Sequence, residues 1–136
     1  GKSDSMHGAP FPVQAVVTAL SDGRYEETGP THGGFRFFND GPSAALRTTD
    51  GYTLVLTSRS AGSSSLQQFR ALGIEPLDMK IVVAKGVHSP RPAMEPIARE
   101  LIWVATPGVT SADLSTFTYR NRRVPLYPLE PDAVWP

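Results

Sequence analysis

The sequence predicts an α+β (mixed α/β) fold in which a β-meander of hairpins is followed by a βαβ-type crossover unit. In the first half, short runs rich in β-branched residues alternate with glycine-containing turns. In the second half, segments with helical spacing alternate with short apolar runs. With 136 residues the chain is long enough for one core, so we expect a single domain over residues 1–136.

The first half is predicted to hold strands at Phe11–Leu20, Arg24–Thr28, Phe35–Phe38, Ser43–Thr48 and Tyr52–Ser58. Asp22-Gly23 and Asp50-Gly51 each lie between two of these runs. Glycine reaches positive φ freely, so Asp-Gly is typical of tight hairpin turns. The two pairs of strands that flank these turns are therefore expected to form two hairpins.

The second half is predicted to hold helices at Ser63–Leu72 and Pro90–Glu100, strands at Met79–Ala84 and Leu101–Ala105, and a helical turn at Ser111–Phe117. Gly73 follows the first helix and should end it. Ser89 could cap the second helix, and Pro96 should kink or restart it because proline lacks a backbone donor. Residues 126–136 contain four prolines and are expected to form an irregular tail.

The two apolar strands of the second half are joined by a helix. This arrangement is typical of a right-handed crossover with parallel strands. Ligand sites of open α/β sheets lie at the carboxyl ends of such strands. The loop after Met79–Ala84 is therefore the first place where we expect a site.

Composition excludes several classes of function. The thirteen basic and thirteen acidic residues balance and form no long block of like charge, so we expect neither nucleic-acid nor membrane binding. No apolar run approaches the ~20 residues of a membrane span. Cysteine is absent, which excludes disulfides and a cysteine nucleophile and fits the reducing cytoplasm, where we place the protein.

Motifs for a complete catalytic or metal centre are missing. The three histidines, His7, His32 and His88, are far apart in the sequence and follow no metal-ligand spacing. No Gly-x-Ser-x-Gly elbow is present, although a Ser–His–Asp triad can assemble from distant residues. We therefore expect no metal site within this chain.

Lys85, His88 and Arg91 remain as the candidate binding residues. They lie on the loop after an apolar strand, where a lysine, a histidine and an arginine could hold a carboxylate or polarise a carbonyl. The alternative is a solvated loop with a single salt bridge from this cluster to Glu95 or Asp78. The residues alone leave both readings open.

Several segments, in this order along nearly the whole chain, resemble the C-terminal domain of the microcystinase C (MlrC) family of metallopeptidases. They are GKSDSMHGAPFPVQAVV, the stretch Asp40–Ala45, Gly73–Glu75 with IVVAK, HSPRPAMEPIARELIWVATPG and YRNRRVPLYPLEPD. The family's lysine-plus-loop motif falls on Lys85, His88 and Arg91, and its Pro-Gly turn on Pro107 and Gly108.

The resemblance implies a longer parent protein, and the opening Gly-Lys-Ser-Asp is expected to continue from a preceding segment. In this family the larger N-terminal domain carries a divalent metal, usually taken to be zinc, and the hydrolytic chemistry. The C-terminal domain packs on it and helps to shape the substrate cleft. The family's Gly-rich acidic segment is missing here, so the domain is expected to be truncated at its N-terminus. Ser89-Pro90 stands where many relatives have an aromatic residue, which weakens the expectation that the loop contacts substrate.

Three hypotheses follow. In the first, the chain supplies the non-metal wall of the cleft, with Lys85, His88 and Arg91 contacting substrate, and is inactive alone. In the second, it is a structural docking or oligomerisation module, whose partners are the N-terminal metal-binding domain or another copy. An autonomous enzyme is the third and is the least supported, because no complete catalytic constellation is visible.

Overall fold

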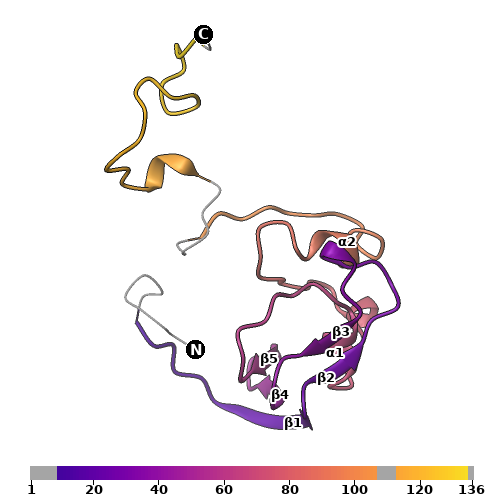
Figure 1. The fold of residues 1–136 in the computed structure, drawn as a ribbon. Coiled ribbons are helices and arrows are strands. Elements are labelled where there is room, and N and C mark those ends of the chain that lie inside the picture. Colours follow the sequence, from indigo (N-terminus) through magenta and orange to yellow (C-terminus); the bar gives the residue numbers. More distant parts are fainter. Residues whose placement is uncertain (1–8, 107–112, 135–136) are drawn as a thin grey trace. The chain divides into compact units, whose positions relative to one another are not determined.

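A computed structural model of the chain describes residues 9–106 and 113–134. The chain divides into two compact units, one over residues 10–102 and the other including residues 103–136. The strands and α-helices of the described residues lie in the first unit. The described residues form a small α+β structure rich in antiparallel sheet, in agreement with the predicted class (Figure 1).

The dominant feature of the first unit is a long, bent antiparallel ladder. Strand β1 (Ala15–Ser21) pairs with β4 (Ser43–Thr48), and the next strand, β2 (Arg24–Glu26), pairs with β3 (Phe37–Asn39). The chain thus runs out along β1 and β2 and returns along β3 and β4. The predicted hairpin across Asp22-Gly23 is wrong, because β1 and β2 belong to different sheets.

Close contact between two glycines explains this bend. Gly23 has φ +73°, and a Cβ atom at this position would lie 1.9 Å from the carbonyl oxygen of Gly41. The Asp40 amide donates to the Gly23 carbonyl at 2.9 Å, so the two chain segments stay bonded through the bend. Asp22-Gly23 can adopt the backbone conformation of a hairpin turn. Here that conformation bends the strand pair between β1–β4 and β2–β3.

The second predicted hairpin is confirmed. Strand β5 (Thr53–Thr57) pairs antiparallel with β4 across a turn that contains Gly51, at φ +86°. The result is a three-stranded sheet in the order β1-β4-β5, with β1 and β5 at its edges.

The first helix, α1 (Gln67–Arg70), is shorter than the predicted Ser63–Leu72. Its end is as expected, because Gly73 has φ +70° and the Ile74 amide donates back to the Phe69 carbonyl at 3.1 Å. A 3₁₀ turn, η3 (Pro76–Asp78), follows.

The second helix, α2 (Arg91–Met94), occupies the start of the predicted Pro90–Glu100 and lies beside the 3₁₀ turn η2 (His32–Gly34). Pro90 takes the cap position, and no side chain caps this helix, so the predicted Ser89 cap does not form. The regular helix stops just before Pro96, as proline chemistry requires.

The predicted βαβ crossover is not formed in the described residues. Neither Met79–Ala84 nor Leu101–Ala105 is a strand. A strand needs a hydrogen-bonding neighbour, and these two apolar runs have none there. Ile81, Val83, Ile102 and Val104 have exposed side chains.

The described part of the second unit, residues 9, 103–106 and 113–134, carries little regular structure. It contains the 3₁₀ turn η4 (Leu114–Thr116), capped by Asp113, whose carboxylate accepts from the Ser115 amide at 3.0 Å. This turn lies within the predicted Ser111–Phe117, part of which is outside the described residues. Pro107 and Gly108 are also outside them. The irregular tail after residue 126 is held by Glu130, which accepts from Arg122 Nη1 at 2.8 Å.

Polar residues are prominent in the interior of the first unit. The buried apolar residues of the described chain are Ala45, Leu72, Ala93 and Met94, together with Pro76 and Pro90. The buried polar residues are Glu27, Asp40, Ser43, Thr48, Ser65 and Gln68. No buried side-chain nitrogen or oxygen of the described residues lacks a hydrogen-bond partner. The interior is therefore held together largely by directed polar contacts.

Candidate functional site

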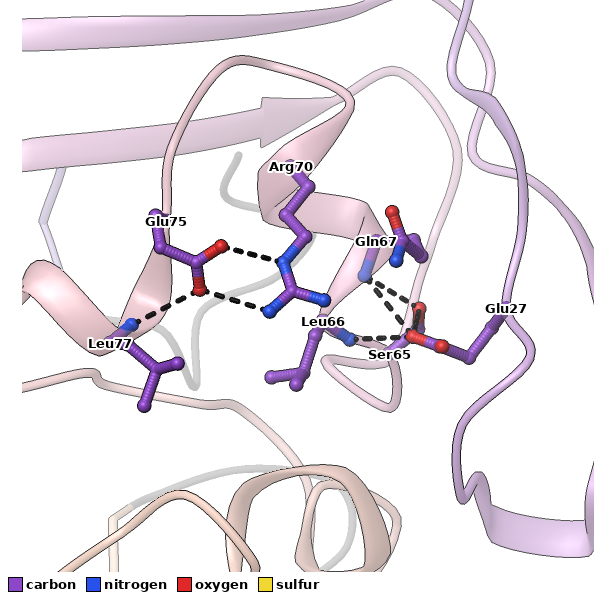
Figure 2. A network of polar contacts seen from close by, with 7 residues as sticks. All are labelled: Glu27, Ser65, Leu66, Gln67, Arg70, Glu75 and Leu77. Carbon is purple, nitrogen blue, oxygen red and sulfur yellow. Dashed lines mark hydrogen bonds and ion pairs between the residues drawn. The ribbon is translucent and has the colours of Figure 1, made fainter.

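A buried carboxylate fixes the segment that leads into α1. Glu27 follows β2, and its Oε2 accepts from the Ser65 hydroxyl at 2.8 Å and from the amides of Leu66 at 3.1 Å and Gln67 at 3.2 Å (Figure 2). The other oxygen, Oε1, accepts from the Gly29 amide at 2.8 Å. Glu27 therefore satisfies backbone donors that the short helix cannot satisfy itself.

These bonds set the charge state of Glu27. Burial alone would raise the pKa of its carboxyl group. The hydrogen bonds from the Gly29 amide, the Ser65 hydroxyl and the Gln67 and Leu66 amides outweigh burial and hold the pKa below its ordinary value of 4.5. At neutral pH Glu27 is therefore ionised, and its carboxylate links the end of β2 to the start of α1 by hydrogen bonds.

A second buried carboxylate, that of Asp40, also accepts hydrogen bonds from side chains of other elements. Asp40 Oδ2 accepts from the Tyr25 hydroxyl at 2.8 Å and from Gln68 Nε2 at 2.7 Å. The Tyr25 ring stacks on Phe38 with centroids 5.0 Å apart. Burial, the hydrogen bond to Asp40 and the negative charges of Asp40 and Glu27 raise the pKa of Tyr25 far above its usual range.

An ion pair secures the far end of α1. Arg70 donates through Nε to Glu75 Oε2 at 2.8 Å and through Nη2 to Glu75 Oε1 at 3.0 Å (Figure 2). Glu75 also accepts from the Leu77 amide at 3.3 Å and so caps η3. Both ends of α1 are therefore anchored by glutamates.

The anchored segment holds the predicted site loop. The Ser63 amide donates to the Lys85 carbonyl at 3.4 Å, and the Lys85 amide donates to Ser63 Oγ at 3.3 Å. Gly86 has φ +143°, and a Cβ atom there would lie 2.6 Å from Ser89 Oγ. Lys85 is therefore hydrogen-bonded to the segment before α1, and the turn from Gly86 to Ser89 is itself tightly folded.

The three predicted binding residues have exposed side chains; Lys85 and His88 lie on this loop, and Arg91 is the first residue of α2. The carbonyl of His88 accepts from the Arg91 amide at 3.1 Å, which starts the turn into α2. The Arg91 side chain makes a bidentate pair with Glu95, with Nε–Oε2 at 2.9 Å and Nη2–Oε1 at 3.0 Å. This pair is the salt bridge to Glu95 that the solvated-loop reading requires.

Chemically, the loop and the start of α2 present an ammonium, an imidazole and a guanidinium, the kinds of group that suit an anionic or carbonyl ligand. Among the residues that the structure describes, no three or more His, Asp or Glu side chains gather in a group able to hold a metal ion. The described part of the chain also contains no helix long and apolar enough to cross a membrane.

The sequence predicted the loop as a candidate site but did not predict the buried polar residues of the elements that hold it. Glu27, Asp40, Tyr25 and Gln68 were not singled out. The available signal was weak: an acidic residue before Thr-Gly-Pro and another before Gly-Pro, both in loops. Apart from Gly29 and Tyr25, the partners of the Glu27 and Asp40 side chains are 28 to 40 residues away, beyond any local pattern.

Comparisons with known proteins agree with the resemblance seen in the sequence. The family model described as MlrC C-terminus matches residues 1–121. Comparisons with curated proteins and with solved structures give no match. Because the family model covers most of the 136 residues, the chain belongs to the MlrC C-terminus family.

Proposed function

We propose that this chain is the non-metal wall of the substrate cleft in a metal-dependent peptidase or amidohydrolase of the MlrC type. Membership of the MlrC C-terminus family implies an N-terminal domain in the same protein. In the proposal that domain carries the divalent ion, which the resemblance implies to be zinc. The ion would activate water for hydrolysis there. We place the protein in the cytoplasm.

The observation that supports the proposal is the anchored loop. Lys85 and His88 are exposed on this loop and Arg91 at the start of α2, and Lys85 is hydrogen-bonded to Ser63. Glu27 fixes the segment just after Ser63 through Ser65. A binding loop on a rigid support loses less conformational entropy when a ligand binds. The three side chains would hold a carboxylate or carbonyl of the substrate.

The ion pair of Arg91 with Glu95 does not prevent this role. More than half of each side chain is exposed, at 53% and 51%. An ion pair so open to water is weak, and a substrate carboxylate can replace Glu95 as the partner of the guanidinium.

The test is hydrolysis by the full-length protein with His88→Ala and Arg91→Ala combined. The proposal expects kcat/KM to fall by about tenfold to a hundredfold, with unchanged folding and metal content. Arg36→Ala is the matched control, because Arg36 is also an exposed arginine paired to a glutamate, Glu26, at 2.7 Å. Wild-type kinetics in the double variant would contradict the proposal.

The second candidate is a docking or oligomerisation module without substrate contacts. The completed Arg91–Glu95 pair favours it, since the loop already has the salt bridge expected of a solvated surface. Under this reading the double variant turns over normally, while substitutions at a domain interface disturb assembly.

A further inference from the structure

A hollow lies between the three-stranded sheet and the chain that follows α1. Its volume is about 510 Å³, and its lining residues all belong to the first unit. Small-molecule sites of proteins have volumes of about 300–1,000 Å³. Lys85, His88 and Arg91 do not line the hollow. It is therefore large enough for a small ligand and distinct from the candidate site, and its lining does not involve the second unit.

A bulge in β1 shapes the sheet side of the hollow. The register of β1 with β4 shifts between Val17 and Ala19, so Thr18 is an extra residue. Consecutive residues of a regular strand lie on opposite faces, yet Thr18 and Ala19 both line the hollow. The Thr18 hydroxyl donates to the Ala45 carbonyl at 3.2 Å, which holds the bulge against β4. Bulges redirect side chains in this way and are frequent beside functional sites.

The other side of the hollow is apolar and is supplied by the chain after α1. Its lining residues there include Leu72, which is buried, Ile74, which is half-buried, and Met79, which is 38% exposed. The Ile74 amide donates to the Phe69 carbonyl at 3.1 Å, so this segment is fixed to α1. A partly exposed apolar surface is stabilised when an apolar group covers it.

Arg47 is the charged residue of the lining. It lies in the middle row of the sheet, paired with Val16 on β1 and Thr53 on β5, and its side chain is exposed. Among the described residues the Arg47 guanidinium has no hydrogen-bond or ion-pair partner, and no acidic residue lines the hollow. A guanidinium binds a carboxylate through two parallel hydrogen bonds. The hollow thus combines an apolar side with one uncompensated positive charge.

We propose that this hollow binds a small carboxylate with an apolar body, such as the C-terminal residue of an apolar peptide or a free aliphatic acid. The carboxylate pairs with the Arg47 guanidinium, and the apolar body covers Leu72 and Met79. An anion is favoured over a cation because Arg47 supplies the charge of the lining. An apolar body is favoured because it removes the side chains of the second wall from water.

This inference goes beyond the proposed function and needs neither a metal ion nor the Lys85 loop. Its test is a binding measurement without turnover. The double variant His88→Ala with Arg91→Ala removes two cations of the candidate site but none from the hollow. It should therefore bind the carboxylate like wild type, which separates this proposal from the proposed function.

N-acetyl-leucine and N-acetyl-leucinamide are matched probes for the full-length protein, because the second replaces the carboxylate by a neutral amide. Calorimetric titration should show that the acid binds and that the amide binds at least about tenfold more weakly, since it loses charge-assisted hydrogen bonds to Arg47. Hexanoate, a free acid without a peptide group, distinguishes the two sources of the ligand. Tighter binding of N-acetyl-leucine supports a peptide C-terminus, and equal or tighter binding of hexanoate supports a free acid.

Variants of the lining test the two halves of the proposal separately. Arg47→Gln should weaken binding of N-acetyl-leucine by about tenfold and leave the amide unchanged, whereas Arg47→Lys should retain part of the difference. Ala71→Leu should weaken both probes, because a larger side chain occupies the hollow while Arg47 remains. Arg59→Gln is the control, since Arg59 is exposed and does not line the hollow.

The proposal is overturned if neither acid binds or if N-acetyl-leucine and its amide bind equally well. It is also overturned if a folded Arg47→Gln or Ala71→Leu variant binds N-acetyl-leucine like wild type. If Arg47→Gln does not fold, Ala71→Leu decides, because Ala71 is exposed and leucine keeps the helix propensity. Loss of binding in the His88→Ala and Arg91→Ala double variant would place the carboxylate at the candidate site and overturn the proposal as well.

Discussion

The Ser65 hydroxyl donates a 2.8 Å hydrogen bond to the carboxylate of Glu27, a residue 38 positions earlier in the chain. Ser65 is completely buried and Glu27 nearly so. This bond joins the end of β2 to the start of α1 and so supports the segment that holds the Lys85 loop.

Glu27→Gln should lower the free energy of unfolding of the first unit by about 2 kcal/mol, because a buried carboxylate that accepts several hydrogen bonds is replaced by an amide that also brings donors. Chemical denaturation followed by circular dichroism measures the change. The neighbouring Glu26→Gln is the control, since Glu26 is exposed and pairs only with exposed Arg36. Equal stabilities for the two variants would mean that the Glu27 contacts are energetically unimportant.

The contribution of Glu27 should depend on pH in a defined direction. Its folded pKa lies below the ordinary value of 4.5, so the unfolded state binds the proton first. The stabilisation is complete above pH 4.5 and disappears as the pH falls through the lower, folded pKa. The difference in stability between wild type and Glu27→Gln, measured from neutral to acid pH, should shrink only in this acid range. A constant difference there would show that charge is not the cause.

Tyr25→Phe should cost about 1 kcal/mol at neutral pH, because it removes the hydrogen bond from the Tyr25 hydroxyl to Asp40. The pKa of Tyr25 is raised in the folded state, so this advantage is present below pH 10.0 and is lost as the pH rises beyond it. Urea unfolding at neutral and alkaline pH tests both statements. Tyr52→Phe, at an exposed side chain, is the control and should leave stability unchanged.

Gly23→Ala should prevent the bend of the long ladder. The new methyl group would meet the Gly41 carbonyl oxygen, and alanine is also strained at φ +73°. Gly51→Ala separates the two effects, because Gly51 has φ +86° but no atom within 4 Å of an added Cβ. We expect a loss of about 1 kcal/mol for Gly51→Ala and a much larger loss, or no folding, for Gly23→Ala. Similar thermal stability of both variants would contradict the close contact of Gly23 and Gly41.

The 136-residue chain by itself should hydrolyse no peptide or amide when zinc is added. In the proposed function, the ion and the chemistry belong to the N-terminal domain. A chromogenic peptide assay with and without zinc and a chelator checks this expectation. Measurable turnover that the chelator abolishes would contradict both the cleft-wall and the docking readings.

Local sequence patterns predicted some elements well and others poorly, for identifiable reasons. The hairpin around Gly51 and the end of α1 at Gly73 were predictable because each depends on a few consecutive residues. Asp22-Gly23 and Asp50-Gly51 are the same dipeptide. At Asp22-Gly23, however, the close contact of Gly23 with Gly41, eighteen residues later, goes with a bend in the antiparallel ladder and not with a hairpin. Whether the apolar runs at 79–84 and 101–105 are strands depends on a neighbour that no local pattern reveals.

In the candidate site, too, local features could be predicted from the sequence and contacts between distant residues could not. Its exposed residues, Lys85, His88 and Arg91, could be proposed from the sequence because they lie within seven consecutive residues. The Glu27 and Asp40 contacts could not be found, because they join residues that are far apart in the chain. Whether the loop binds substrate or is only solvated depends on the partner that Arg91 has in the working protein. Substitutions at Arg91 and Glu95 therefore distinguish the two readings.

The most direct test of the proposed binding role is kcat/KM of the full-length protein with Arg91→Ala and, separately, Glu95→Gln. If Arg91 holds substrate, Arg91→Ala should lower kcat/KM, whereas Glu95→Gln should raise it by a few-fold because it frees the guanidinium from its competing partner. If the pair is only a surface salt bridge, neither substitution will change kcat/KM. That result would contradict the binding role.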